Sequence, residues 1–294
     1  MELIIATVSE TFCWGRLKFF YVMNFLANKG VKWGVLMMNR YQGLLVDLDG
    51  TIYFKGKLIK DAIDFLHWLK RKGIVIRYLT NTNGTPPAKI VERLREVGLD
   101  IQDEQFFNPT KVAKAYFGKN ESLSYYVMAS DDIKAEFKDG HWDEKNPDCV
   151  LLGALEEVCH YDEINKVFNF IANGSQLMST SYSLYYYAST GERKIDTGAF
   201  TRMFEASTGV KAQLIGKPSR LFYQMVLEST TLDPKECIAI GDDIDTDIVG
   251  ANQCGIYSVL VQTGKYNDAY VQASEIVPNQ ILPSLPMARK FWVK

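Results

Sequence analysis

The chain has 294 residues, which corresponds to one large domain or to two domains of ordinary size. Apolar residues make up 47% and charged residues 23% of it, values typical of a folded globular protein, so a disordered or collagen-like chain is excluded. With 33 basic and 35 acidic residues the formal net charge is −2, and composition gives no global electrostatic reason for binding nucleic acid or a membrane. We therefore expect any phosphate chemistry to come from a local site.

Residues 1–40 differ from the rest because they contain five basic and two acidic residues, which gives a local net charge of +3. Their apolar runs fall short of the ~18–20 uncharged residues that cross a bilayer. No small-residue cleavage site follows an apolar core, as a secretory signal would require. We expect an N-terminal extension over residues 1–42. Its origin stays open between a surface extension, an upstream reading-frame artefact and a mitochondrial leader.

From residue 43 onward, short apolar runs that predict buried strands alternate with apolar residues at helical spacing. Strands are predicted at 44–48, 74–79, 125–129, 149–153, 176–180, 213–216, 237–240 and 257–261. Helices are predicted at 61–72, 87–97, 110–117, 131–138, 162–172, 198–207, 219–228, 245–253 and 282–294. This alternation predicts an α/β fold with parallel sheets covered by helices on both faces. Ligands bind such folds at the carboxyl ends of the strands.

The cysteines and histidines give no sign of a metal centre. The five cysteines are scattered and form no Cys-x-x-Cys pair, and the three histidines are not clustered. We expect mostly buried free thiols in a reducing compartment, which favours the cytoplasm.

The first predicted strand ends in two aspartates and a glycine. Asp47 and Asp49 are two residues apart, so on a strand they point to the same side. Two carboxylates this close repel each other unless a cation or a proton lies between them, and a hard divalent cation fits that position. A calcium loop or a plain turn are the alternatives. An EF-hand loop needs its glycine at the sixth position and a preceding helix, whereas Gly50 is fourth from Asp47 and follows a strand.

Two further strand ends carry groups that suit phosphate. Thr80 and Asn81 follow the strand at 74–79, and hydroxyl, amide and backbone N–H groups can bind phosphate, although the segment also fits an ordinary loop. Lys217 follows the strand at 213–216 and can offset the charge of a carboxylate and a phosphate together. Most exposed lysines, however, are solvated surface.

The strand at 237–240 runs through Gly241 into a cluster of acids. A run of charge is usually a solvated face, and a helix N-terminus accounts for one or two acidic residues. A divalent metal accounts for more of them. Four acids fall within six residues, Asp242, Asp243, Asp245 and Asp247.

In their order along the chain, these segments resemble the four motifs of the haloacid dehalogenase-like superfamily. The resemblance covers about residues 43–265, with Thr82 standing where many relatives have a second asparagine. Asn81 and Lys217 are 136 positions apart, and the surplus chain is similar to the large α/β cap of the subfamily IIA phosphatases. Finer matches, such as Gln262–Tyr266, are most similar to the phospholysine phosphohistidine inorganic pyrophosphate phosphatase branch. The matching motif residues are Asp47–Thr51, Thr80–Asn81, Lys217 and Gly241–Asp243 with Asp247.

The resemblance implies a Rossmann-like parallel sheet core with an inserted α/β cap of the C2 type. The core would comprise residues 43–118 and 210–294, and the cap residues 119–209. A tyrosine-rich loop within the cap would select the substrate through Ser181, Tyr182 and Tyr185. The same tyrosines could instead pack the cap sheet or form a dimer between two caps, and a homodimer through the cap is implied by the resemblance only.

The resemblance also implies a Mg²⁺-dependent phosphatase that hydrolyses phosphate monoesters of small metabolites through an aspartyl-phosphate. Asp47 would be the nucleophile and Asp49 the general acid and base. Mg²⁺ would be bound by Asp47, the Asp49 backbone and Asp242. Metal waters or Lys217 would be oriented by Asp243 and Asp247. The phosphate would be bound by Thr80, Asn81 and Lys217.

Two other functions stay open. One is a phosphatase of phosphoamino acids or pyrophosphate. The other is a non-catalytic module that binds phosphate or a partner, which the presence of both Asp47 and Asp49 disfavours because binding alone needs only one of them. Apart from the homodimer that the resemblance implies, we expect a small phosphorylated substrate as partner, with neither nucleic acid nor a membrane.

Overall fold

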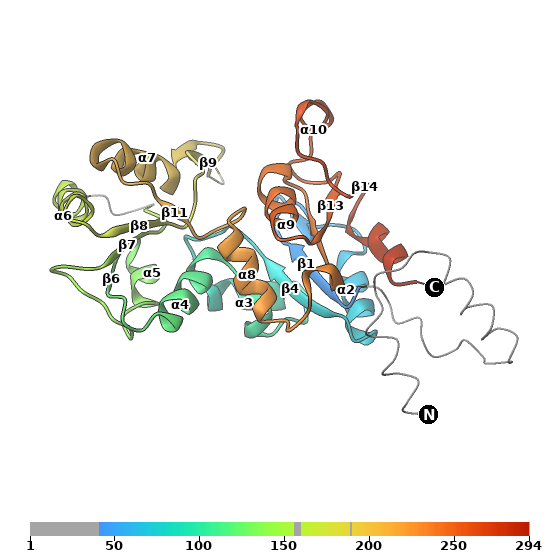
Figure 1. Cartoon of the computed structure of the whole chain (residues 1–294). Helices are drawn as coiled ribbons and strands as arrows, with labels where there is room; N and C mark the ends of the chain where they lie inside the picture. Colours follow the sequence, from blue (N-terminus) through green and yellow to red (C-terminus); the bar gives the residue numbers. More distant parts are fainter. Residues whose placement is uncertain (1–40, 156–159, 189, 294) are drawn as a thin grey trace, which may run out of the picture. The chain divides into compact units, whose positions relative to one another are not determined.

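The computed structural model describes residues 41–155, 160–188 and 190–293. Most of the predicted N-terminal extension lies outside the described residues. Two parallel sheets organise the described chain, and Figure 1 traces them in sequence colours. Both were expected from the strand–helix alternation, and the predicted α/β class is confirmed.

The larger sheet has six parallel strands in the order β14-β13-β12-β1-β4-β5. Its central strands are long apolar runs, as a sheet buried on both faces requires. Between and after them come α2 (Ala62–Arg71), α3 (Pro87–Glu96), α8 (Arg220–Glu228), α9 (Val249–Gln253) and α10 (Asp268–Ala273). The strands are β1 (Gly43–Asp47), β4 (Val75–Leu79), β5 (Phe106–Phe107), β12 (Cys237–Gly241), β13 (Tyr257–Val261) and β14 (Gln280–Leu282).

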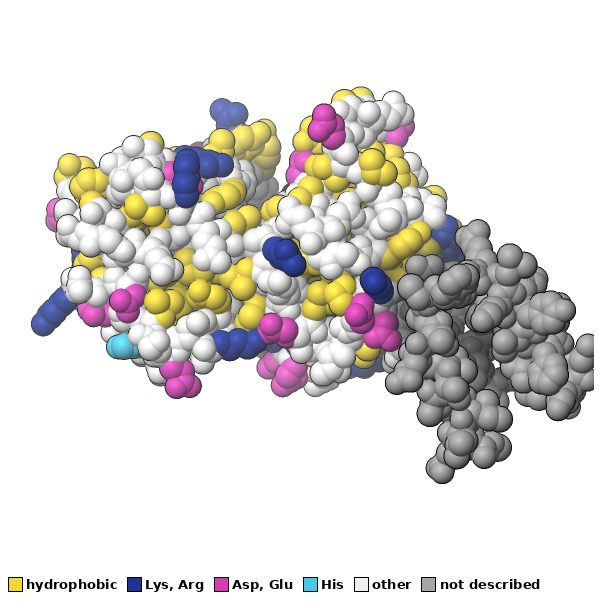
Figure 2. All heavy atoms as spheres, viewed as in Figure 1, with side chains coloured by type: hydrophobic (Ala, Val, Ile, Leu, Met, Phe, Trp, Pro, Cys, Tyr) yellow, Lys and Arg dark blue, Asp and Glu magenta, His cyan; other side chains and the backbone are white. Residues whose placement is uncertain are grey.

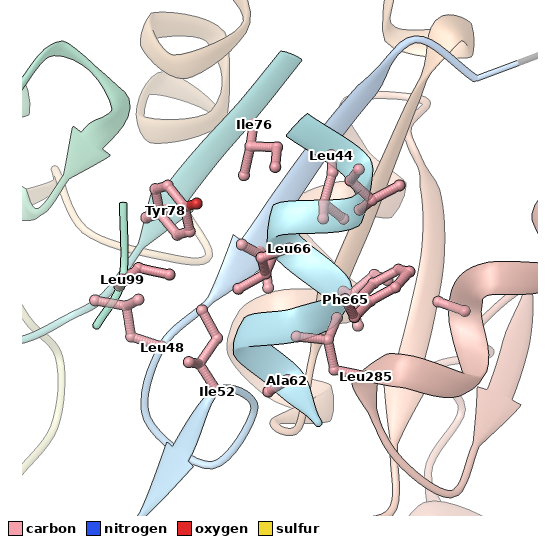
Figure 3. Close-up of a cluster of buried hydrophobic side chains, with 14 of the residues drawn as sticks. Leu44, Leu48, Ile52, Ala62, Phe65, Leu66, Ile76, Tyr78, Leu99 and Leu285 are labelled. Carbon is pink, nitrogen blue, oxygen red and sulfur yellow. The ribbon is translucent and has the colours of Figure 1, made fainter. Parts of the chain in front are cut away.

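The two faces of this sheet are covered by different helices. Alternate residues of β1 point to opposite faces: Leu44 packs in one buried cluster with Phe65 and Leu66 of α2, whereas Leu45 packs in another with Phe222 of α8. Figure 3 shows Phe65 and Leu66 lying over the side chains of β1 and β4. Helix α8 begins directly after Lys217, with the Ser219 hydroxyl accepting a hydrogen bond from the Phe222 N–H, so packing of α8 also fixes the approach of Lys217.

The inserted sheet has four parallel strands in the order β11-β8-β7-β6. One face of this sheet packs in a buried cluster of its own, which includes Val150 of β7 and Phe204 of α7, whereas Leu151 of β7 belongs to the cluster that contains Phe222. The residue limits predicted for the cap stay a prediction. The elements of this part are β6 (Tyr125–Met128), α5 (Asp131–Ala135), β7 (Cys149–Leu152), α6 (Tyr161–Ala172), β8 (Gln176–Ser179), α7 (Thr197–Thr208) and β11 (Gln213–Leu214). Helix α4 (Pro109–Lys119) precedes them, and buried residues of this helix belong to the cluster that contains Leu45 and Phe222.

Except for β11, the elements of two or three residues were not predicted, because so few residues carry too little periodicity to recognise. They include the antiparallel hairpins β2 (Tyr53–Phe54) with β3 (Lys57–Leu58), and β9 (Tyr185–Tyr187) with β10 (Arg193–Ile195). The remaining short turns are the 3₁₀ helices η1 (Asp103–Gln105) and η2 (Pro234–Glu236).

The prediction of one helix over 282–294 was wrong. Leu282 ends β14, where it pairs with Val261, and the chain then forms the 3₁₀ helix η4 (Leu285–Phe291). Two prolines in this stretch remove backbone donors that a regular α-helix would use. The predicted helix at 245–253 begins as a π-helical turn, η3 (Ile244–Ile248), and continues as α9.

Surface features agree with the near-neutral composition. On the face drawn in Figure 2, basic and acidic side chains are interspersed and do not form a patch of one sign. No helix among the described residues combines the length and apolarity needed to cross a bilayer. The three cysteines within the described ranges, Cys149, Cys237 and Cys254, are free thiols.

The Leu66→Ala substitution tests the packing of α2 on the sheet. Leu66 is 1% exposed, so the cavity and the lost burial should lower the free energy of unfolding by about 2–5 kcal/mol. Urea unfolding followed by circular dichroism measures this. Met287→Ala is the control, because Met287 is 54% exposed and should cost little. Equal midpoints for the two variants would contradict this account of the core.

Candidate active site

The predicted site residues meet at one edge of the larger sheet. Strands β12, β1 and β4 are parallel neighbours, so their carboxyl ends lie side by side. Asp47 ends β1, Thr80 follows β4, and Asp242 follows β12. Lys217 approaches the same edge from the segment between β11 and α8 and is 4% exposed. Residues up to 195 positions apart in sequence therefore share one small volume.

Lys217 connects two of the acids directly. Its ammonium Nζ donates to Oδ1 of Asp47 at 2.6 Å and to Oδ1 of Asp247 at 2.7 Å. Asp47 also accepts a hydrogen bond from the Thr51 hydroxyl at 3.1 Å. An ammonium has three protons, and these contacts use two of them, so one donor is left for a further group at the site.

Three carboxylates are buried together here. Asp47, Asp242 and Asp247 are 3–5% exposed, and each offers an oxygen within 4.8 Å of the others. Among the described residues, Lys217 is the one cation in direct contact with them, so the four side chains carry three negative charges and one positive charge when ionised. An excess negative charge this deep is costly unless a cation or a proton neutralises it.

The pKa values of these groups follow from that crowding. Burial raises the pKa of Asp242 to about 7, with the negative charge of Asp247 adding to the effect. Burial also raises the pKa of Asp47 well above its usual range, against the opposing charge of Lys217. For Lys217, burial acts to lower the pKa, but Asp247 and Asp47 outweigh it and the pKa is raised.

The arrangement fits a hard divalent cation. Such ions take oxygen ligands, and the donors gathered here are all carboxylate oxygens at mutual distances that one ion can span. A divalent ion would also cancel the two excess negative charges. The structure therefore supports a metal site at Asp47 and Asp242, with Asp247 in the same group.

Asp242 is enclosed by backbone from two loops. A Cβ at Gly50 would lie 2.0 Å from its Oδ2, and a Cβ at Gly264 would lie 1.9 Å from the same atom, so both positions require glycine. Both glycines also have positive φ, +92° and +60°, which side chains disfavour. The backbone N–H of Lys265 donates to Oδ2 of Asp242 at 2.6 Å. The loop after β13 thus orients the Asp242 carboxylate.

Asp49 is exposed and lies outside the buried trio. Its Oδ2 accepts hydrogen bonds from the hydroxyls of Thr80 at 3.2 Å and Thr82 at 3.4 Å. The Tyr53 hydroxyl hydrogen-bonds the same carboxylate, and burial together with this negative charge raises the pKa of Tyr53. Asp49 is therefore held by hydroxyls at the solvent side of the site.

Asn81 contacts the backbone of Lys217 through both ends of its amide. Its Nδ2 donates to the Lys217 carbonyl at 2.9 Å, and its Oδ1 accepts from the Lys217 N–H at 2.8 Å. This reciprocal pair joins the loop after β4 to the segment that carries the lysine. Asn81 therefore positions Lys217, and one N–H of its amide is left for a ligand.

Asp243 and Asp247 stabilise the turn that carries Asp242. Asp243 accepts from the N–H groups of Asp245 and Thr246, and its other oxygen accepts from Lys265 Nζ at 2.9 Å. Burial acts to raise the pKa of Asp243, but the Lys265 charge outweighs it and lowers the pKa. Asp247 accepts the Asp243 N–H at 3.2 Å as well as Lys217.

The three residues predicted to select the substrate lie in the inserted part of the chain. Ser181 is buried, and the Tyr182 hydroxyl donates to the Ala212 carbonyl while Arg202 lies over its ring at 4.9 Å. Tyr185 is 49% exposed on β9. Contacts of Ser181 and Tyr182 are thus packing contacts within this part, and a role in selecting substrate stays a prediction.

Sequence reasoning gave no role to several residues that contact the site. Thr51, Thr82 and Tyr53 bond the two aspartates, and Gly264 and Lys265 enclose Asp242. The sequence did contain a signal for Gly264 and Lys265, because polar residues follow the buried strand β13. This strand is a neighbour of β12, which ends directly before Asp242. Tyr53 lies on a hairpin too short to predict.

Comparison with known proteins agrees with this geometry. A family model described as haloacid dehalogenase-like hydrolase matches residues 44–143, and one described as HAD-hydrolase-like matches residues 214–288. Together they include β1, β4 and β12, but not most of the inserted sheet.

Individual relatives extend the similarity over most of the chain. Phospholysine phosphohistidine inorganic pyrophosphate phosphatase from Danio rerio is 30% identical over 76% of this chain and 84% of its own length. The Xenopus laevis protein of the same name is 29% identical over 85% of this chain and 94% of its own length. The solved 4-nitrophenylphosphatase from Thermotoga maritima is 25% identical, with a TM-score of 0.79, covering 86% of this chain and 97% of that one. The chain therefore belongs to the haloacid dehalogenase-like hydrolases, in the phosphatases of subfamily IIA.

Proposed function

We propose that this protein is a Mg²⁺-dependent phosphatase that hydrolyses phosphate monoesters of small metabolites through an aspartyl-phosphate on Asp47. The observation that carries the proposal is the buried group of Asp47, Asp242 and Asp247 with Lys217 in direct contact. Buried acids that outnumber the buried cations destabilise a fold by themselves. Their presence therefore favours a role in binding a metal and, through the metal, a phosphate.

Asp47, Asp242 and the backbone carbonyl of Asp49 would hold the Mg²⁺. This ion prefers oxygen ligands and keeps several waters, which suits a site open on one side. When bound, it supplies charge neutralisation for the phosphoryl oxygens and for the nucleophile. Asp247 and Asp243 would orient the groups around these ligands, because their oxygens are already engaged by Lys217, Lys265 and backbone N–H groups.

Asp47 is the proposed nucleophile. Its carboxylate is fixed by hydrogen bonds from Lys217 and Thr51, so an oxygen can be presented to phosphorus without a large loss of side-chain entropy. The remaining ammonium proton of Lys217 would bind a phosphoryl oxygen, together with Thr80 and the free N–H of Asn81. Most of the rate would come from this positioning and from charge neutralisation.

Asp49 is the proposed general acid and base. It is exposed toward the side from which a substrate would enter, and it is held by Thr80 and Thr82. As an acid it would give its proton to the leaving oxygen when the P–O bond breaks. As a base it would then take a proton from the water that attacks the phosphorus of the aspartyl-phosphate, which restores Asp47.

A phosphatase of phosphoamino acids or pyrophosphate is a second candidate. The names of the Danio rerio and Xenopus laevis relatives favour it, since they specify phospholysine, phosphohistidine and pyrophosphate. The proposed chemistry at Asp47 is the same for P–N and P–O bonds. Release of inorganic phosphate from a panel that contains both kinds of substrate, with and without Mg²⁺, distinguishes these functions and also tests the non-catalytic alternative.

Asp47→Asn should reduce turnover to background because an amide does not attack phosphorus, while the fold stays intact. Phosphate release from 4-nitrophenyl phosphate measures the activity, and circular dichroism checks the fold. Asp49→Asn is the comparison: it should slow turnover by about 10²–10⁴-fold, yet leave metal binding in place, since the proposed contact is through the backbone. Near-normal activity of Asp47→Asn would show that the nucleophile is wrongly assigned.

Mg²⁺ should raise the midpoint of thermal unfolding, because the ion binds the folded chain and relieves the repulsion among buried acids. At 100 times the dissociation constant the added stability is about 2.7 kcal/mol. Asp242→Asn should weaken this effect, and EDTA should reverse it in the wild type. A melting temperature that does not respond to Mg²⁺ in the wild type would argue against the metal site.

Gly264→Ala should weaken metal binding because a methyl group at this position collides with the Asp242 carboxylate. Gly255→Ala is the matched control: Gly255 has a φ of +72°, close to the +60° of Gly264, but nothing lies within 4 Å of its Cβ position. Both variants place a side chain at a positive φ, so they share that cost in stability. Only Gly264→Ala also displaces the Asp242 carboxylate, so only this variant should raise the Mg²⁺ concentration needed for half-maximal activity. Equal Mg²⁺ dependence in both would contradict the enclosure of Asp242.

A further inference from the structure

An apolar groove lies on the core beside the proposed active site. It has a volume of about 250 Å³ and runs between the β2–β3 hairpin and helix α3. Its apolar walls are Tyr53 and Leu58 from the hairpin, Ile90 and Leu94 from the helix, and Val97 directly after the helix; Arg93 of the helix also lines the groove. Of the residues that line this groove, the proposed mechanism uses only Thr82, which holds Asp49.

Two residues that line the groove contact Asp49. Thr82 lines the groove, and its hydroxyl hydrogen-bonds the Asp49 carboxylate at 3.4 Å. Tyr53 lines it from the other side, and its hydroxyl contacts the same carboxylate. The hydroxyl ends of these side chains thus face Asp49, while the ring of Tyr53 forms the apolar wall beyond it.

The helical wall of the groove is continuous. Ile90, Leu94 and Val97 follow the i, i+4, i+7 spacing of one helix face, which gives a wall about 10 Å long at 1.5 Å per residue. Core packing explains Ile90 and Leu94, which are buried, but it does not explain Val97 at 47% exposure or Leu58 at 45%. These two side chains leave apolar surface facing solvent across the groove.

The position of Asp49 relates the groove to the chemistry. A general acid must lie next to the oxygen that leaves with the organic part of the substrate. The carbon skeleton attached to that oxygen continues away from phosphorus, beyond Asp49, and the groove begins there. An apolar wall binds apolar surface by removing it from water, at about 25 cal/mol per Å².

We propose that this groove is the binding site for the leaving group of the substrate, and that it favours phosphate monoesters with an aromatic or branched apolar leaving group. The inference rests on the proposed function, because it needs Asp49 as the acid. It places part of the substrate selection on the core hairpin and α3, in addition to the residues Ser181, Tyr182 and Tyr185 predicted for that role.

Steady-state kinetics of Leu58→Asn and Val97→Asn test the proposal with two substrates, phenyl phosphate and glycerol phosphate. The substituted side chains are neutral and exposed, so neither the charge at the site nor the core changes. Each variant should lower kcat/KM for phenyl phosphate about tenfold and change kcat/KM for glycerol phosphate less than twofold. Val277→Asn is the control, because Val277 is a 73% exposed valine outside the groove, and it should alter neither value.

Inhibition by phenylphosphonate and methylphosphonate gives a second measurement that needs no bond cleavage in the probe. The two groove variants should weaken inhibition by phenylphosphonate alone. If the variants change both substrates equally or leave both unchanged, the groove proposal is overturned while the phosphatase proposal stands. If the wild type hydrolyses neither substrate with Mg²⁺ present, the proposed function fails, and the groove proposal fails with it.

Discussion

The site depends on the imbalance between buried negative and positive charge. Asp47, Asp242 and Asp247 share one small volume, and within the part of the chain that the structure describes Lys217 is the one cation in direct contact with them. An ammonium with two hydrogen bonds can pair two carboxylates, but a third carboxylate buried beside them is costly to ionise without another cation. The raised pKa of Asp242 expresses the same strain. A bound divalent ion removes it, so metal binding, stability and the proposed catalysis are linked.

The parallel sheet makes this arrangement possible. Because β12, β1 and β4 are adjacent and parallel, their loops emerge at one edge and bring together residues that are distant in sequence. Each acid is then fixed by a neighbouring loop: Thr51 bonds Asp47, and the loop with Gly264 encloses Asp242. A carboxylate that is held in place loses little freedom when it binds a metal or attacks phosphorus.

Substrate selection would be divided between the core and the inserted part. The apolar groove between the β2–β3 hairpin and α3 begins at Asp49, the side chain that would protonate the leaving oxygen. In the inserted part, Tyr182 is occupied by contacts with Ala212 and Arg202, whereas Tyr185 keeps an exposed ring.

The sequence by itself determined the α/β class, the order of the main strands and helices, and the candidate residues at strand ends, because buried strands and helices have strong periodicity and acids after an apolar strand are conspicuous. It could not show which acids are buried together: Asp243 and Asp247 look alike in sequence, yet only Asp247 contacts Lys217. It also missed the β2–β3 hairpin, and with it Tyr53 and the groove, and it mistook residues 282–294 for one helix. The strands of the hairpin are too short to show periodicity, and the two prolines within 282–294 already disfavoured a helix there. The contacts that build the site, such as that of the Lys265 N–H with Asp242, join separate segments of the chain, so only the tertiary structure decides them.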